Sequence, residues 1–261
     1  MSIGLIGGSG IYSLGLINKS NEIKIQTPYG NPSSLYLSIE LGDKRVFFLN
    51  RHGLNHTIPP HKVNYRANIW GFKNLGVKKI ISINAVGGIN TNLNPGNIVL
   101  LDQIIDMTFG MRASTFFDGP EVAHVDFTEP FCSALREKIK ASAKEINIEI
   151  IDGGVYVCVN GPRLETSAEI KFFAQIGASV VGMTLMPEAS LSREAEMCFA
   201  SIAIVTNMAA GISQNRLTVN EVIETMRLSN EQINKLLTHI INAPDLNKDC
   251  ICNHALKDAF I

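Results

Sequence analysis

The sequence of 261 residues lacks any excess of positive charge and has few charged side chains of either sign. Charged residues make up 18% of the chain and the formal net charge is -1, so we do not expect nucleic acid as a partner. No segment approaches the roughly 18 consecutive apolar residues that a membrane span needs, so no membrane association is expected. The beginning of the chain lacks the charged and long apolar segments of a secretory signal. Together these absences favour a cytoplasmic protein.

Cysteine is also scarce, and none of the five cysteines belongs to a C-x-x-C pair. The segment CICNH near the C-terminus contains Cys250, Cys252 and His254, and it could hold a metal ion or form a strained disulfide. The sequence shows nothing else that would supply the remaining ligands of a metal site. We therefore expect buried, unreactive thiols and no bound metal.

Apolar residues are abundant, at 46% of the chain, and they follow two alternating patterns. Short segments rich in Ile and Val alternate with segments of helical spacing, which predicts a single α/β domain with a mixed β-sheet flanked by helices. We assign residues 1–245 to this domain and residues 246–261 to a C-terminal tail. Strands are expected at 3–8, 44–50, 77–88, 96–106, 148–159, 178–184 and 200–207, and helices at 64–75, 130–146, 166–176, 188–199 and 218–242.

Two of the expected helices begin with a capping box. Thr166 and Glu169 have the T-x-x-E spacing of this motif, and so do Thr218 and Glu221. Glu169 therefore has a structural role, whereas Glu165 lies just before the cap, where its carboxylate could point towards a ligand.

Small and polar residues gather where several expected strands end. The first strand ends in a glycine-rich segment whose amides and Ser9 hydroxyl could cradle a phosphate, although its spacing fits neither a dinucleotide loop nor a P-loop. Arg51 and His52 follow another strand and could supply hydrogen-bond donors to an oxyanion. Thr184 and Asn207 end two more strands, and ligands of α/β sheets bind at such ends, so one cleft is predicted. An ordinary turn and a solvated basic loop are the alternative interpretations of the first two segments.

The motifs IGGSG, VNYRANIW, NAVGG, GPRLET and VGMT follow the order and spacing of a known family. From about residue 3 to 240 the chain resembles the methylthioadenosine phosphorylase branch of the trimeric purine nucleoside phosphorylases. This resemblance implies a nucleoside phosphorylase-like fold and cleavage of a purine nucleoside with inorganic phosphate as co-substrate. It also implies no metal or organic cofactor, and a homotrimer in which subunits share pocket residues.

The resemblance also assigns roles to individual residues. The phosphate site would contain Ser9, Arg51, His52, Asn84, Ala85 and Thr184. The nucleoside site would contain Met183 under the ribose, Leu164, Glu165, Asn207 and Ala209 at the base, and His56, Val219, Val222 and Ile223 near the 5′ end, with His124 from a neighbouring subunit. Asn207 and His52 would be the catalytic residues, and Glu165, Asn207 and Val219 would set specificity.

Two departures from that branch concern the base. Where methylthioadenosine enzymes have a pair of aspartates, this chain has Asn207 and Ala209, and where they have a serine it has Glu165. These residues resemble the sister branch that takes inosine and guanosine. An ionised Glu165 can only accept hydrogen bonds, so it fits the N1–H of a 6-oxopurine and opposes the N1 lone pair of adenine. Together with the apolar 5′ pocket, this predicts phosphorolysis of S-methyl-5′-thioinosine to hypoxanthine and 5-methylthioribose 1-phosphate.

Four other interpretations stay open at the level of sequence. The chain could be a methylthioadenosine phosphorylase or a broad purine nucleoside phosphorylase acting on inosine, guanosine and adenosine. It could also be a non-catalytic protein that binds a purine or a phosphate, which would require only the glycine turns and Arg51. Finally, Glu165 could pair with a nearby Arg or Lys and have no contact with a base.

Overall fold

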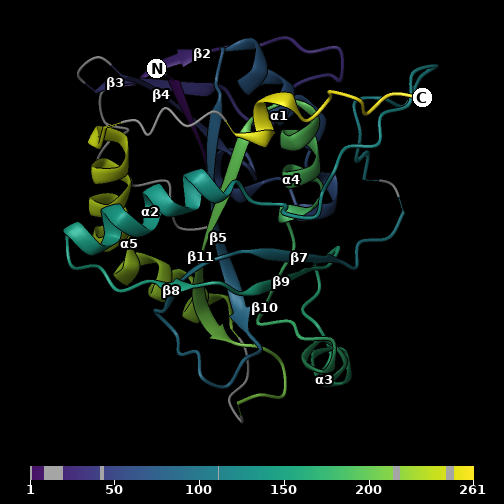
Figure 1. Cartoon of the computed structure of the whole chain (residues 1–261). Coiled ribbons are helices and arrows are strands. Elements are labelled where there is room, and N and C mark those ends of the chain that lie inside the picture. The colour runs from purple at the N-terminus through teal and green to yellow at the C-terminus, as the bar shows by residue number, and fades with distance from the viewer. Residues whose placement is uncertain (1, 9–19, 42–43, 111, 214–217, 245–249) are drawn as a thin grey trace.

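The computed structural model describes residues 2–8, 20–41, 44–110, 112–213, 218–244 and 250–261. In this part of the chain, eleven strands form one mixed sheet with helices on both faces (Figure 1), which confirms the predicted α/β fold. The strands are β1 (Ser2–Gly7), β2 (Asn21–Ile23), β3 (Tyr36–Leu41), β4 (Lys44–Asn50), β5 (Lys79–Gly88), β6 (Ile98–Leu100), β7 (Gln103–Asp106), β8 (Ile151–Asp152), β9 (Val155–Cys158), β10 (Val180–Gly182) and β11 (Cys198–Met208). The helices are α1 (Tyr65–Asn74), α2 (Ser133–Glu145), α3 (Ser167–Gln175), α4 (Leu185–Glu194) and α5 (Val219–Asn242), with short 3-10 helices η2 (Leu54–His56), η3 (Pro60–Lys62) and η4 (Ile251–His254).

Four parallel strands form the centre of the sheet. β1 lies between β4 and β5, and β11 runs parallel to β5 on the other side. Because these strands are parallel, their carboxyl ends lie at the same edge. β10 meets that edge by pairing antiparallel with the last residues of β5. Ligands of α/β sheets bind at such an edge, so the sheet itself positions the site.

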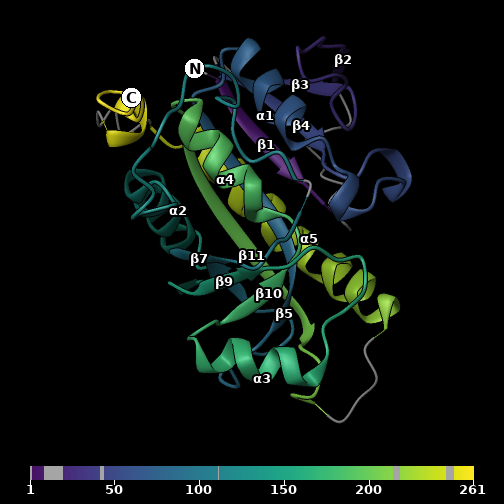
Figure 2. The same cartoon turned by 90° about the vertical axis from the view of Figure 1, so that its right-hand side faces the viewer.

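The sequence of β4 explains why helices cover both faces. Val46 and Phe48 pack in the core cluster that contains residues of α2 and α5, whereas Phe47 and Leu49 pack in the cluster that contains residues of α1 and α4. Successive side chains of a strand point to opposite faces, so a continuous apolar strand must be covered twice. Figure 1 shows α2 and α5 on one side of β5 and β11, and α1 and α4 on the other. α3 lies apart from these helices, next to β10 (Figure 2).

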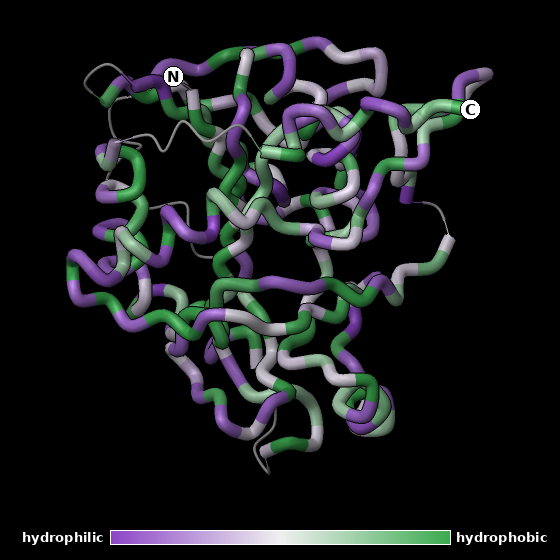
Figure 3. Tube along the Cα trace, in the orientation of Figure 1, coloured by the Kyte–Doolittle hydropathy of each residue, from purple (hydrophilic) through white to green (hydrophobic). Residues whose placement is uncertain are grey.

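The long helix α5 is amphipathic, and its first turns lie outside the core. Ile233 and Leu236 are completely buried, whereas Val219 and Ile223 are 72% and 53% exposed. This confirms the expectation that part of the apolar stripe is not core. Figure 3 shows the alternation of hydrophobic and hydrophilic residues along this and the other outer helices. None of the described helices is both long and apolar enough to cross a membrane.

Some expected element boundaries are wrong, and the reasons are local. The helix expected at 188–199 begins at Leu185 and ends at Glu194, because β11 already begins at Cys198. The strand expected at 148–159 is interrupted at Gly153 and Gly154, which have φ of 91° and 159°, a conformation that favours glycine. The strand expected at 96–106 is likewise two strands, β6 and β7.

The sequence interpretation missed β2 and β3. These two strands pair antiparallel with each other, and β3 pairs with β4. The signal for β3 was the segment YLSIEL, which precedes Gly42 and Asp43 and then β4, a turn-like sequence between two apolar segments.

The C-terminal residues pack against the rest of the chain. The Cys252 side chain is buried, and the backbone of the last residues runs antiparallel to residues 122–124. His124 N–H donates to the carbonyl of Ala259 at 2.8 Å, and the ring of Phe260 lies edge to face with that of Phe117 at 5.2 Å. The tail therefore holds the loop that carries His124.

Candidate active site

A cavity of about 530 Å³ opens at the carboxyl ends of the central strands, large enough for a small organic ligand. Its wall combines residues that end β4, β5, β10 and β11 with the loop before α3 and the start of α5. The lining residues are Gly8, Arg51, His52, His56, Thr57, Pro59, Pro60, Asn84, Ala85, Val86, Gly87, Pro162, Leu164, Glu165, Val181, Gly182, Met183, Thr184, Thr206, Asn207, Ala209, Val219 and Val222.

Arg51 follows β4, and its guanidinium is held by Glu188 of α4. Arg51 Nε and Nη2 donate to the two carboxylate oxygens at 2.5 and 3.0 Å, and Nη2 also donates to the Ser82 hydroxyl at 2.7 Å. Nη1 lies beside Gly8, where an added Cβ would come within 2.9 Å of it. Burial is the largest single influence and would lower the pKa of Arg51, but the charge and the hydrogen bonds of Glu188, with smaller contributions from Tyr65 and Tyr156, together raise it. The cavity therefore has a permanently charged cation with a fixed orientation.

The Glu188 side chain is the main part of the site that sequence reasoning missed. It is completely buried although it carries a carboxyl group. The available signal was a single acidic residue inside the otherwise weakly polar segment LMPEASL. An acidic residue in such a segment is expected to need a buried cation as partner.

Asn84 and Thr184 continue this polar network. Thr184 Oγ1 donates to Asn84 Oδ1 at 2.9 Å, and Asn84 Nδ2 donates to the hydroxyls of Ser82 and Ser201 at 3.0 and 2.9 Å. All four side chains are buried. Because both amide atoms of Asn84 have partners, its orientation is fixed, and a ligand would meet a polar wall that is already assembled.

His52 is a neutral hydrogen-bond acceptor at the cavity. Its Nδ1 lies 2.8 Å from the carbonyl oxygen of Ile58, which can only accept, so Nδ1 carries the ring hydrogen. Burial and the nearby charge of Arg51 lower the pKa of His52 to about 3, so Nε2 has no hydrogen at neutral pH. In this tautomer Nε2 offers an acceptor to the cavity, whereas the sequence predicted a donor from His52. His56 stacks on it, with ring centroids 4.3 Å apart.

Glu165 occupies the position before the helix cap that the sequence indicated. The capping box is present, because Thr166 Oγ1 accepts from Glu169 N–H at 3.1 Å and the Glu169 carboxylate accepts from Thr166 N–H. Arg163, which lies two residues before Glu165 in the chain, donates to Glu169 at 2.7 and 2.9 Å. Glu165 thus forms no ion pair with any residue that the structure describes, and burial raises its pKa. The cavity is thus lined by a carboxylate that has no ion-pair partner in the part of the chain that the structure describes.

Asn207 reaches the cavity because β11 contains a bulge. Val205 pairs with Val86 and Asn207 pairs with Gly87, so Thr206 is an extra residue in the ladder. A bulge redirects the side chains that follow it. Asn207 Nδ2 donates to the carbonyl of Met208 at 3.0 Å, which leaves its second hydrogen for a ligand.

Another part of the cavity wall is apolar. Leu164 precedes Glu165, and Val219 and Val222 begin α5. Leu164 is 52% exposed, so this part lies at the mouth of the cavity. Met183 also lines the cavity, and its carbonyl accepts a hydrogen bond from Arg112 at 2.8 Å.

Most of the predicted site residues are brought together in this cavity, including Ala85 and Ala209. Ser9 lies outside the described residues. Ile223 and His124 do not line the cavity of this chain. The site therefore combines an anion-binding wall, a carboxylate and an amide, and an apolar mouth, and this combination suits a ligand with chemically different ends.

A second group of reactive side chains lies away from this cavity. The thiols of Cys132, Cys198, Cys250 and Cys252 all lie within 4.8 Å of one another. The expectation that the tail cysteines have no further ligands beside them is therefore wrong, because the fold brings two distant cysteines to them.

Comparison with known proteins places these features in a family. The model of the phosphorylase superfamily matches residues 2–242. A probable S-methyl-5′-thioinosine phosphorylase of Thermodesulfovibrio yellowstonii is 52% identical over 99% of this chain and 97% of its own length. A probable 6-oxopurine nucleoside phosphorylase of Thermococcus kodakarensis is 46% identical over 98% of each chain. The structure of methylthioadenosine phosphorylase from Schistosoma mansoni in complex with adenine is 35% identical, with a TM-score of 0.92 over 98% of this chain and 97% of that one.

Proposed function

The chain belongs to the phosphorylase superfamily and is a purine nucleoside phosphorylase, and we propose that its preferred substrate is S-methyl-5′-thioinosine. The products would be hypoxanthine and 5-methylthioribose 1-phosphate. The observation that carries this choice is the Glu165 carboxylate, which lines the cavity without an ion pair to any described residue. The similar proteins are named for different substrates, namely thioinosine, 6-oxopurine nucleosides and methylthioadenosine. The base is therefore inferred from the residues that line the cavity.

The presence of both Glu165 and Asn207 at the cavity supports a 6-oxopurine as the base of the substrate. Ionised Glu165 would accept the N1–H of hypoxanthine, and the free Nδ2 hydrogen of Asn207 would be donated to N7. Adenine has a lone pair at N1, so binding it would leave the carboxylate without a donor. A site built around one hydrogen bond can discriminate against such an analogue by about 10⁴-fold.

The apolar mouth supports a methylthio group at the 5′ end. Val219 and Val222 are the residues of α5 that line the cavity among the described residues, and both are apolar. A 5′-hydroxyl would lose hydration at such a wall, whereas a methylthio group would not. The expected preference is modest, because one apolar contact discriminates by about 1–3 kcal/mol.

We assign the phosphate to the wall formed by Arg51, Asn84 and Thr184. Arg51 is charged and oriented by Glu188, so it would hold a phosphate oxygen without reorganisation during the reaction. His52 offers an acceptor at Nε2, which fits a protonated phosphate oxygen. The cavity would therefore favour the phosphate monoanion over the dianion.

In the proposed reaction the glycosidic bond breaks and a phosphate oxygen bonds to C1′ of the sugar. The electron pair of the broken bond moves to the purine, which later takes up a proton. The sugar carries positive charge in the transition state and the purine carries negative charge. Asn207 would stabilise that negative charge at N7 as it develops, which lowers the barrier. No electrons are gained or lost, so the reaction needs no redox cofactor, and inorganic phosphate is the only co-substrate that we assign to it.

We also propose that the enzyme is a homotrimer in which His124 completes a neighbour's cavity. His124 does not line the cavity of its own chain. Exposed apolar side chains lie near the cavity mouth, and a subunit contact would cover them. They include Leu164, Val219 and Ile223.

A substrate panel tests the proposed function. S-methyl-5′-thioinosine, S-methyl-5′-thioadenosine, inosine and adenosine are each incubated with the enzyme, with and without phosphate, and the free base is quantified by chromatography. Release should require phosphate, and kcat/KM should be highest for S-methyl-5′-thioinosine, lower for inosine and lowest for the adenine nucleosides. Faster cleavage of methylthioadenosine would identify a methylthioadenosine phosphorylase instead. Similar rates for all four would indicate a broad enzyme, and binding without cleavage would indicate a non-catalytic protein.

A further inference from the structure

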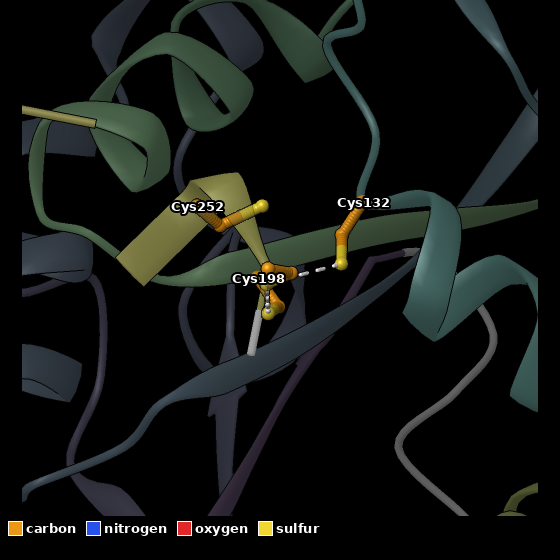
Figure 4. Close-up of side chains that lie close together, drawn as sticks. Cys132, Cys198 and Cys252 are labelled. Atoms are coloured by element: carbon orange, nitrogen blue, oxygen red, sulfur yellow. Dashed lines mark hydrogen bonds between the residues drawn. The ribbon is translucent and has the colours of Figure 1, made fainter. Parts of the chain in front are cut away.

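Four cysteines from three distant parts of the sequence meet at one point on the side of the sheet covered by α2 and α5. Cys132 precedes α2, Cys198 begins β11, and Cys250 and Cys252 flank the start of η4. Figure 4 shows the thiols of Cys132, Cys198 and Cys252 converging from these three elements. All four sulfur atoms lie within 4.8 Å of one another.

We propose that this cluster is a tetrathiolate site for a zinc ion, which fixes the C-terminal segment to the rest of the fold. Zinc bound by four thiolates is tetrahedral, with Zn–S bonds of about 2.3 Å and hence sulfur atoms about 3.8 Å apart. The Sγ atoms of Cys132 and Cys250 lie 3.9 Å apart and those of Cys198 and Cys250 lie 3.2 Å apart. The distance of 3.9 Å is close to this edge length and that of 3.2 Å is shorter, and both exceed the S–S bond length of about 2.05 Å.

The surroundings of the cluster suit thiolates. Cys132 is the N-cap of α2, so the positive end of the helix dipole lies at its thiol. The side chain of Arg193 lines the cavity beside Cys132, Cys250 and Cys252. Both positive groups would offset the negative charge of four thiolates around one divalent ion.

An ion could also reach the site. Cys132, Cys250 and Cys252 line a cavity at the surface, whereas Cys198 lies behind them at the start of β11. Three of the four cysteines are buried and Cys250 is half-buried. Structural zinc sites have this arrangement of closed coordination with an entry path.

The zinc site would also affect the active site, because the C-terminal tail contacts the loop that carries His124. After η4 the last residues pair with residues 122–124, and His124 donates its N–H to Ala259. His124 is the residue that we assign to a neighbouring cavity. A zinc ion at the four cysteines would therefore hold the segment that positions this loop. This consequence depends on the proposed trimer, but the zinc site itself does not depend on the proposed function.

Metal content of the full chain tests the site directly. The enzyme is expressed with zinc in the medium, purified anaerobically with a reductant, and examined by native mass spectrometry and by elemental analysis. We expect one zinc per chain. Replacement by cobalt should give the thiolate-to-cobalt charge-transfer band and the visible spectrum of a tetrahedral site.

Three variants separate a metal site from a disulfide. Cys252→Ser should lose the zinc and lower Tm by about 5 °C or more, because binding of a structural metal is part of the folding free energy. Cys252→His should keep one zinc, since His is also a zinc ligand, although it cannot form a disulfide. Cys158→Ala is the matched control, because Cys158 is a buried cysteine outside the cluster, and it should keep the zinc.

Other results would overturn the proposal. One is a wild-type chain without zinc whose thiols all react with alkylating agents. Another is a mass deficit that shows disulfide bonds among these cysteines after anaerobic purification. Loss of zinc should also accelerate hydrogen exchange at the amides of His124 and Ile261, and unchanged exchange in the zinc-free protein would contradict the role of the site in holding the tail.

Discussion

The guanidinium of Arg51 illustrates how individual residues set up this cavity. Glu188 stabilises its charged form and fixes its plane through two hydrogen bonds, and the absence of a side chain at Gly8 leaves room for Nη1. The same pair is a risk for stability, because removing one partner leaves a buried charge without compensation. Stability and phosphate binding can therefore be separated by comparing the removal of one partner with the removal of both.

Replacing Arg51 by Ala should raise the KM for phosphate by tenfold or more, since a charge-assisted hydrogen bond contributes about 1.5–3 kcal/mol. Tm should also fall, because the Glu188 carboxylate stays buried without its partner. The control is the double variant Arg51→Leu with Glu188→Leu, in which Tm should recover while phosphate affinity does not. Normal phosphate saturation in Arg51→Ala would remove Arg51 from the phosphate site.

Glu165 makes the pH dependence differ between substrates. Burial raises its pKa above the ordinary value of 4.5, so protonation begins at a higher pH than for an exposed glutamate. The ionised form is the stronger acceptor for the N1–H of a 6-oxopurine, so kcat/KM for methylthioinosine should fall as the pH falls through this pKa. The protonated form can donate to N1 of adenine, so activity on methylthioadenosine should rise over the same range. Glu165→Gln should remove both trends, and parallel pH profiles for the two substrates would contradict this role.

At the scale of elements, the sequence predicted the site best where a residue's role depends on its immediate neighbours in the chain. The capping boxes at Thr166 and Thr218 placed the starts of α3 and α5 correctly, and with them Glu165 and Val219. The sequence-based prediction failed where the role of a residue depends on the folded backbone and on burial. The acceptor role of His52 follows from the carbonyl of Ile58 and from burial, and neither is visible in the sequence.

The first turn of α5 should control the preference for the 5′ group. Val222→Thr keeps the shape of the side chain but adds a hydroxyl, so it should reduce the preference for methylthioinosine over inosine about tenfold, which corresponds to one apolar contact. Ile223→Thr is the matched control, because Ile223 lies on the same helix but not at the cavity. The ratio of kcat/KM for the two substrates measures the effect. An equal change in both variants would show that the helix start does not contact the 5′ group.

At the scale of the whole molecule, the alternation of apolar segments was enough to predict an α/β fold. It was not enough to reveal the four-cysteine cluster, because Cys132 and Cys198 meet the tail only through the packing of α2 and β11. Nor could it show that the tail holds the loop of His124. Such pairings lie far apart in the chain and depend on the complete fold.

Shared cavities can be tested by complementation between subunits. Arg51→Ala impairs the cavity of its own chain, whereas His124→Ala should impair only the neighbour's. Coexpressed chains with one change each would form mixed trimers, in which some cavities have Arg51 and a neighbouring His124 together. Activity should then exceed the mean of the two separate variants, with light scattering confirming the trimer. Activity no higher than the mean, or a fully active monomer, would contradict shared cavities.

The choice of base can be tested most directly by exchanging the two residues that set it. kcat/KM is measured with saturating phosphate for methylthioinosine and methylthioadenosine, in the native enzyme and in the double variant Glu165→Ser with Asn207→Asp. The native enzyme should prefer methylthioinosine by a factor approaching about 10⁴, as expected when a buried hydrogen-bonding group would otherwise be left unpaired. The double variant should lose activity on methylthioinosine and gain activity on methylthioadenosine. A native enzyme that cleaves methylthioadenosine faster, or a preference that the two substitutions leave unchanged, would contradict the selection of the base by Glu165 and Asn207.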